Sequence, residues 1–154
     1  LKLNNFKNIY LNKLGVGNIS GQFNIKVDTL SNRGVNRITM SPDNYSETIN
    51  VIKLDEYAES KQITNIGLIK IDVEGYELNV LQGAINTISK YHPILFIEVD
   101  DNNLREQGHS AEVLISFLQN SGYKITNAEE NKKISSSDNF TNCHFDIICK
   151  YNNE

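Results

Sequence analysis

The chain has 154 residues, a formal net charge of -4 and a sequence pI near 5.4. This length suits one domain with its own core, and the acidic balance leaves no basic stripe for a nucleic acid. No apolar run reaches the ~18 residues that a membrane span needs, and no signal-peptide pattern opens the chain. Composition therefore predicts a soluble, cytoplasmic protein of one domain, with no nucleic-acid partner and no membrane span.

The first 60 residues alternate between short apolar runs and polar stretches. The pattern predicts the end of a helix over 1–7, strands over 9–14, 22–28 and 49–52, an exposed loop over 30–46, and a turn of helix over 55–60. Residues 15–21 carry two glycines of a dinucleotide-binding loop, but Ser20 stands where the third belongs. Because a strand pattern rather than a helix follows, we expect a plain turn there.

Residues 68–99 read as strand, helix and strand. The apolar run 68–71 suits a parallel strand buried on both faces. From Leu78, apolar residues recur at helical spacing until about Lys90, where the following Pro93 prevents continuation and opens a strand over 94–99. This order is typical of a crossover between two parallel strands.

Acidic residues follow both of these strands. Asp72 and Glu74 come after the first strand, and Glu98, Asp100 and Asp101 close the second. Because ligands collect at the carboxyl ends of parallel strands, we expect these acids to meet at one edge of the sheet.

The C-terminal third predicts one helix and two strands. Residues 102–108 read as a loop, and Ser110 as the N-cap of a helix that Gly122 ends. Strands over 123–126 and 144–151 are expected to form an antiparallel pair, joined by the polar loop 127–142.

The motif KIDVEGYE followed by LxxLxGA, residues 70–84, resembles the signature of the FkbM-type methyltransferases. The segment VIKLDEY (51–57) and residues 8–21 resemble the parts of this family that lie upstream. The resemblance implies an α/β fold with a Rossmann-like class I methyltransferase sheet, mostly parallel with an antiparallel C-terminal strand. It also implies S-adenosyl-L-methionine as cofactor.

In that family the first two strands carry a glycine-rich turn and a ribose-binding acid, and neither is found in this sequence. The chain also begins at Leu1 rather than Met. We therefore expect residues 1–154 to be a single partial domain that lacks the N-terminal cofactor-binding strands and is poorly active alone. In the family's strand order, 3-2-1-4-5-7-6, loss of strands 1 and 2 leaves a gap of roughly 14 Å, at ~4.8 Å per strand step, between the strands expected over 9–14 and 68–71. The exposed edge of the sheet then favours self-association.

Within this resemblance the acids become candidate catalytic residues. Asp72 is the first candidate for the general base and also a candidate cofactor contact, while Glu74 and Glu98 are further catalytic candidates. His109, next to a helix start, is a candidate substrate contact. Glu77 is expected to be structural, because negative charge at a helix N-terminus is stabilised by the helix dipole.

The sequence thus predicts an O-methyltransferase that acts on a hydroxyl of a small molecule, sugar or lipid. Two alternatives stay open. One is a non-catalytic α/β module that associates through an exposed sheet edge. The other is a hydrolytic site in which Asp72, Glu74 and Glu98 hold a divalent cation such as Mg²⁺, which the lack of clustered histidines disfavours.

Overall fold

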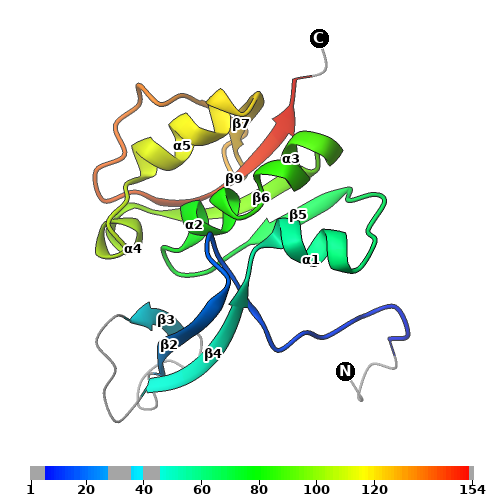
Figure 1. Ribbon diagram of the computed structural model, residues 1–154. Helices are drawn as coiled ribbons and strands as arrows, with labels where there is room; N and C mark the ends of the chain where they lie inside the picture. Colours follow the sequence, from blue (N-terminus) through cyan, green and yellow to red (C-terminus); the bar gives the residue numbers. More distant parts are fainter. Residues whose placement is uncertain (1–5, 28–35, 40–45, 153–154) are drawn as a thin grey trace.

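The computed structural model describes residues 6–27, 36–39 and 46–152, which form two sheets and five helices (Figure 1). The strands are β1 (Gly15–Val16), β2 (Gly21–Val27), β3 (Asn36–Thr39), β4 (Ser46–Ile52), β5 (Leu68–Ile71), β6 (Ile94–Asp100), β7 (Tyr123–Asn127), β8 (Lys133–Ile134) and β9 (His144–Tyr151). The helices are α1 (Leu54–Ser60), α2 (Glu77–Gln82), α3 (Ile85–Tyr91), α4 (Asp101–Glu106) and α5 (Ala111–Asn120). Within these ranges no helix has the length and apolar content needed to cross a membrane.

The C-terminal sheet contains strands β5 to β9 in the order β5-β6-β9-β7-β8. The parallel pairing of β5 with β6 and the antiparallel pairing of β7 with β9 are both confirmed. The sheet is mixed: the C-terminal strand β9 is antiparallel to both β6 and β7, as expected, so β5, β6 and β7 run in the same direction, and the short β8 is antiparallel to β7. The last strand inserts between β6 and β7 in the reverse direction, which leaves one parallel pair.

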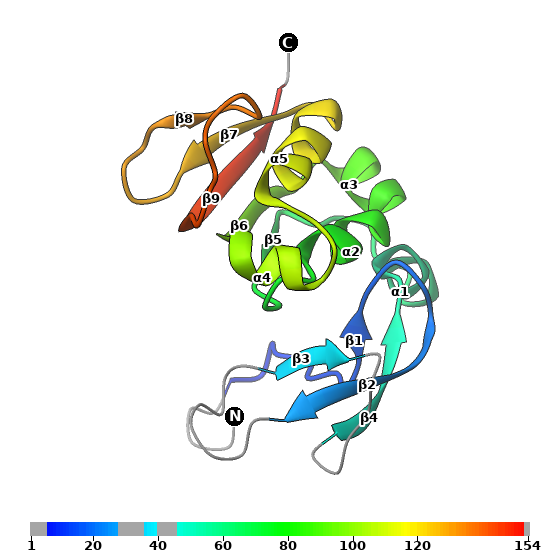
Figure 2. The same ribbon diagram turned by 90° about the vertical axis from the view of Figure 1, so that its left-hand side faces the viewer.

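One face of this sheet carries the core. Along β6 the side chains of Leu95, Ile97 and Val99 are fully buried, whereas the alternate residues are partly exposed. Figure 2 shows α2, α3 and α5 along the same face of the sheet. The expectation that residues 68–71 are buried on both faces is therefore wrong. Leu68 is 60% exposed, because in the described part of the chain these helices cover one face.

The helix expected from Leu78 to about Lys90 is divided into α2 and α3. The division lies at Gly83, where the backbone of the turn after β1 approaches so closely that a Cβ atom would lie 1.9 Å from the carbonyl oxygen of Gly17. Asp55 of α1 then accepts the N–H groups of Asn86 and Thr87 at 3.0 and 2.8 Å. Contacts from distant parts of the chain thus end one helix and begin the next.

The N-terminal sheet contains strands β1 to β4 in the order β1-β4-β2-β3. The predicted strand over 9–14 is wrong, since the chain pairs with β4 only at β1. Tyr10 is 87% exposed, and an extended backbone without a neighbouring strand makes no ladder of hydrogen bonds. The loop expected over 30–46 contains β3, which pairs with β2, so the expectation is also wrong for these residues. Residues 1–5, 28–35 and 40–45 lie outside the described ranges.

The other predicted elements are confirmed with small shifts of their ends: β2, β4, α1, β5, β6, α5, β7 and β9. Ser110 caps α5, and its hydroxyl accepts the N–H of Val113 at 3.3 Å. The loop expected over 102–108 is wrong, because it contains most of α4. Asp100 accepts the N–H of Asn103 at 2.9 Å and so acts as the N-cap of that helix. The turn at 15–21 runs into β2, as expected for a plain turn.

Candidate functional site

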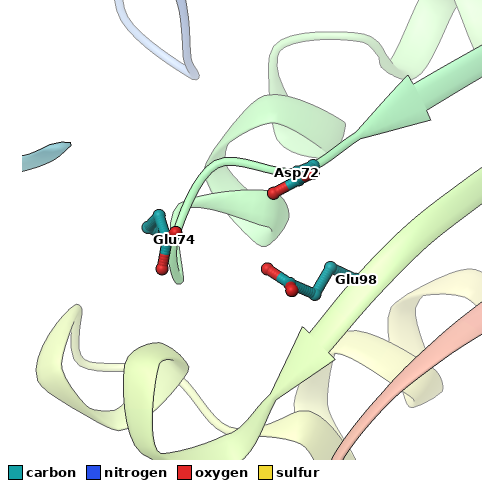
Figure 3. A group of neighbouring side chains, drawn as sticks. All are labelled: Asp72, Glu74 and Glu98. Atoms are coloured by element: carbon teal, nitrogen blue, oxygen red, sulfur yellow. The ribbon is translucent and has the colours of Figure 1, made fainter. Parts of the chain in front are cut away.

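Asp72, Glu74 and Glu98 form a cluster of carboxylates at the ends of two parallel strands. Asp72 directly follows β5, Glu74 lies on the loop that leads to α2, and Glu98 belongs to β6. One carboxylate oxygen from each residue lies within 4.8 Å of the others. Figure 3 shows the three side chains converging on a shared space. The structure thus brings together the three acids that the sequence singled out.

Each of these carboxylates has a protein partner. Lys70 lies 2.6 Å from Asp72, and this bond raises the pKa of Lys70. The amide of Asn103 donates to Glu74 at 3.0 Å, and the Nε2 atom of His144 lies 3.1 Å from Glu98. The spacing of the acids would admit a cation, but these partners already supply donors or positive charge, so we assign no metal to the cluster.

Glu77 binds the backbone of the loop that carries Asp72 and Glu74. The Oε1 atom of Glu77 accepts the N–H groups of Val73 at 3.3 Å and of Gly75 at 3.0 Å. Glu77 is only 1% exposed, and burial raises the pKa of its carboxyl group. These contacts agree with the structural role expected for Glu77, although it acts by holding the loop as well as by its position at the start of α2.

The loop also needs an unusual backbone at two neighbouring residues. Glu74 has φ of 53° and Gly75 has φ of 95°, in the left-handed region. A Cβ atom on Gly75 would lie 2.3 Å from the carbonyl oxygen of Asn103 in α4. The absence of a side chain at Gly75 therefore allows α4 to pack against the loop and lets Asn103 reach Glu74.

The two other acids near the end of β6, Asp100 and Asp101, have structural contacts. Asp100 caps α4, as described above, and lies beside the cluster on the same strand as Glu98. The buried Asp101 accepts the N–H of Ala111 at 3.0 Å and pairs with Arg105 at 2.7 Å. Burial alone would raise the pKa of Asp101, but these two partners hold it below its ordinary value. Asp101 thus joins α4 to α5 and does not belong to the carboxylate cluster.

Two histidines differ in their relation to the cluster. The Nε2 atom of His109 lies 2.9 Å from the amide oxygen of Asn79 in α2, and its contact with substrate stays a prediction. His144 of β9, which the sequence reading did not select, contacts Glu98 directly. The strand order 4-5-7-6 implied by the family resemblance was the available signal, because it places the last strand beside β6.

Comparison with known proteins identifies the family. The model for the methyltransferase FkbM domain matches residues 2–125. The chain belongs to the FkbM methyltransferase family. This match includes all three acids of the cluster, whereas His144 lies beyond it.

A similar curated protein is the hexuronic acid methyltransferase AglP of Haloferax volcanii, which is 28% identical over 83 residues. The aligned region covers 54% of this chain and 34% of that relative, so the chain spans about a third of its length. No solved structure matches the chain.

Proposed function

We propose that this FkbM methyltransferase chain carries the acceptor-binding part of an S-adenosylmethionine-dependent O-methyltransferase. Its family membership and the carboxylates at the ends of β5 and β6 support this proposal. The order β5-β6-β9-β7 is the one expected for strands 4-5-7-6 of a Rossmann-like class I sheet. On this view the N-terminal cofactor-binding strands of the family's sheet are not part of these 154 residues.

The charges of the cluster suit one end of the cofactor. S-adenosylmethionine supplies an electrophilic methyl group on a positively charged sulfur, next to an ammonium group. Asp72, Glu74 and Glu98 present negative charge within 4.8 Å of one another, and Asp72 is the carboxylate that we assign to the cofactor. Its ion pair with Lys70 lies at the surface and is therefore weak enough to exchange for another cation. The turn at 15–21 leads into a strand, so it does not supply the family's glycine-rich turn.

Glu98 is the carboxylate best placed to remove the proton of an acceptor hydroxyl. The sequence alone predicts Asp72 as the first candidate for this base. The contacts favour Glu98, because the carboxylate of Asp72 is paired with Lys70, which has no lone pair to accept a proton when charged, whereas the partner of Glu98 is a histidine that can itself take up a proton. Glu74, held by Asn103, is placed to orient the acceptor.

The acceptor that fits this site is a neutral hydroxyl compound. Three carboxylates in one cluster would repel an anionic acceptor. The same carboxylates accept hydrogen bonds from hydroxyl groups. A sugar or another polyol therefore suits the site better than a molecule that presents a carboxylate for methylation.

Transfer of a labelled methyl group tests this proposal. The complete product of the gene that encodes this chain should transfer methyl from S-adenosylmethionine to neutral glycosides, and at least ~10-fold more slowly to the matching hexuronates, because one unfavourable charge contact costs about 1.4 kcal/mol or more. Equal or faster labelling of the hexuronates would contradict the neutral acceptor. Lack of labelling of every hydroxyl acceptor would count against the O-methyltransferase.

A second candidate function is association through a sheet edge. Among the described strands, β5 lies at an edge of the C-terminal sheet. The exposed apolar side chains include Leu68 of β5 and Tyr10 and Leu11 in the segment before β1. If this is the role of the chain, it should self-associate at moderate concentration. Sedimentation velocity measures this directly, and a single monomeric species would count against the association module.

A further inference from the structure

His144 is held between two carboxylates of the neighbouring strand. It is the first residue of β9 and pairs with Asp100 of β6, while Asp146 pairs with Glu98. Because directly opposed residues of antiparallel strands point to the same side, these four side chains share one face of the sheet. The Nε2 atom of His144 lies 3.1 Å from Glu98, and its Nδ1 atom lies 3.7 Å from Asp100.

Glu98 lies between this histidine and the other acids of the cluster. Its carboxylate contacts His144 and also reaches within 4.8 Å of Asp72 and Glu74. The side chain of Glu98 is 25% exposed, whereas that of His144 is 64% exposed. The described contacts therefore connect the cluster, through Glu98, to a histidine that is open to water.

We propose that His144 receives, through Glu98, the proton that the acceptor hydroxyl loses during methyl transfer. The proposal rests on the function proposed above. The O–H bond of the acceptor breaks, its proton goes to a carboxylate oxygen of Glu98, and its electron pair stays on the acceptor oxygen. That oxygen forms the bond to the methyl carbon as the carbon–sulfur bond of the cofactor breaks and leaves its electron pair on sulfur. The proton then moves from Glu98 to the lone pair of His144 Nε2, and the imidazolium releases it to water.

The position of Asp100 suits this direction of transfer. Its carboxylate lies beside Nδ1, so once Glu98 carries the proton, the charge of Asp100 favours the tautomer with hydrogen on Nδ1 and a lone pair on Nε2. A distance of 3.7 Å is beyond hydrogen-bond range, but it is short enough for charge attraction. His144 thus acts as a proton-accepting partner that regenerates Glu98 as a base.

The charges around His144 set the sign of the pH dependence. The hydrogen bond with Glu98 is the largest cause that raises its pKa above 6.5, and the charges of Glu98, Asp100 and Asp146 act in the same direction. A histidine with a raised pKa stays protonated to higher pH and accepts a proton only when neutral. Methyl transfer should therefore increase with pH as His144 loses its proton, at a pH above 6.5.

Two measurements test this inference. In the wild-type protein, NMR of the histidine Cε1–H group should show His144 titrating above 6.5, and Glu98→Gln should lower that pKa. In the complete gene product, His144→Gln should lower kcat about 10-fold at pH 8, leave KM nearly unchanged and abolish the rise of kcat with pH. The matched control is His92→Asn, which removes a histidine whose ring stacks on Tyr151 and so has a different partner from His144. Asparagine tolerates the positive φ of position 92.

The outcomes separate the two proposals. If the wild type transfers methyl groups and His144→Gln keeps the wild-type kcat and pH profile, the relay is wrong and the proposed function stands. If Glu98→Gln leaves the pKa of His144 unchanged, the coupling of the two residues is wrong. If the wild type transfers no methyl group under any condition, the relay falls together with the proposed function.

Discussion

Replacement of Glu98 by glutamine should slow methyl transfer by about 10²-fold or more, because a general base contributes on the order of 10² to 10⁴ to the rate. Glutamine keeps the shape of the side chain and can still bond to His144, but it cannot take up the acceptor proton. Affinity for S-adenosylhomocysteine should stay nearly constant, because Asp72 and Glu74 retain their charges. Steady-state kinetics with saturating cofactor measures the change in kcat.

A matched control is Glu129→Gln, which removes one negative charge from an exposed loop residue. Its rate should equal that of the wild type. If Glu98→Gln retains the wild-type rate while Asp72→Asn loses about 10²-fold, the proton acceptor is Asp72, as the sequence alone suggests. If neither variant loses activity, the carboxylate cluster is not the site of proton removal.

Replacement of Gly75 by alanine should cost roughly 2 to 4 kcal/mol of unfolding free energy, since overpacking and a strained backbone add. The new Cβ would lie 2.3 Å from the carbonyl oxygen of Asn103, and an L-residue at φ of 95° is strained. Relief of the clash must move the loop or α4, which separates Asn103 from Glu74. We expect a melting temperature roughly 5 to 15 °C lower for a chain of this size, with loss of methyl transfer.

Gly67→Ala is the matched control for this variant. A Cβ atom at Gly67 would meet no atom within 4 Å, so its unfolding free energy should change by no more than about 0.5 kcal/mol. A melting temperature for Gly75→Ala as high as that of Gly67→Ala would mean that the loop and α4 are not packed as described.

The sequence predicts the carboxylate cluster because the relevant pattern is local. The strands before Asp72 and at Glu98 are short apolar runs on either side of an amphipathic segment, and parallel pairing then brings their carboxyl ends together. The same local signals place Ser110 as the N-cap of α5. These features depend on residues close together in the chain.

The errors arise where distant parts of the chain decide the structure. α2 ends at Gly83, where the backbone of Gly17 packs against the helix, and this approach depends on a residue far away in the sequence. The strand expected over 9–14 begins with an apolar run but has no described strand beside it. His144 enters the site because β9 inserts between β6 and β7, about 46 residues after Glu98.

The most direct test of the methyltransferase assignment is calorimetric titration of S-adenosylhomocysteine into the 154-residue chain and into the complete product of its gene. We predict that the complete product binds the ligand and that the 154-residue chain alone does not, because the carboxylate cluster suits only the charged end of the cofactor. Binding by the 154-residue chain would show that the cofactor pocket is complete without further strands. Binding by neither protein would contradict the proposed function.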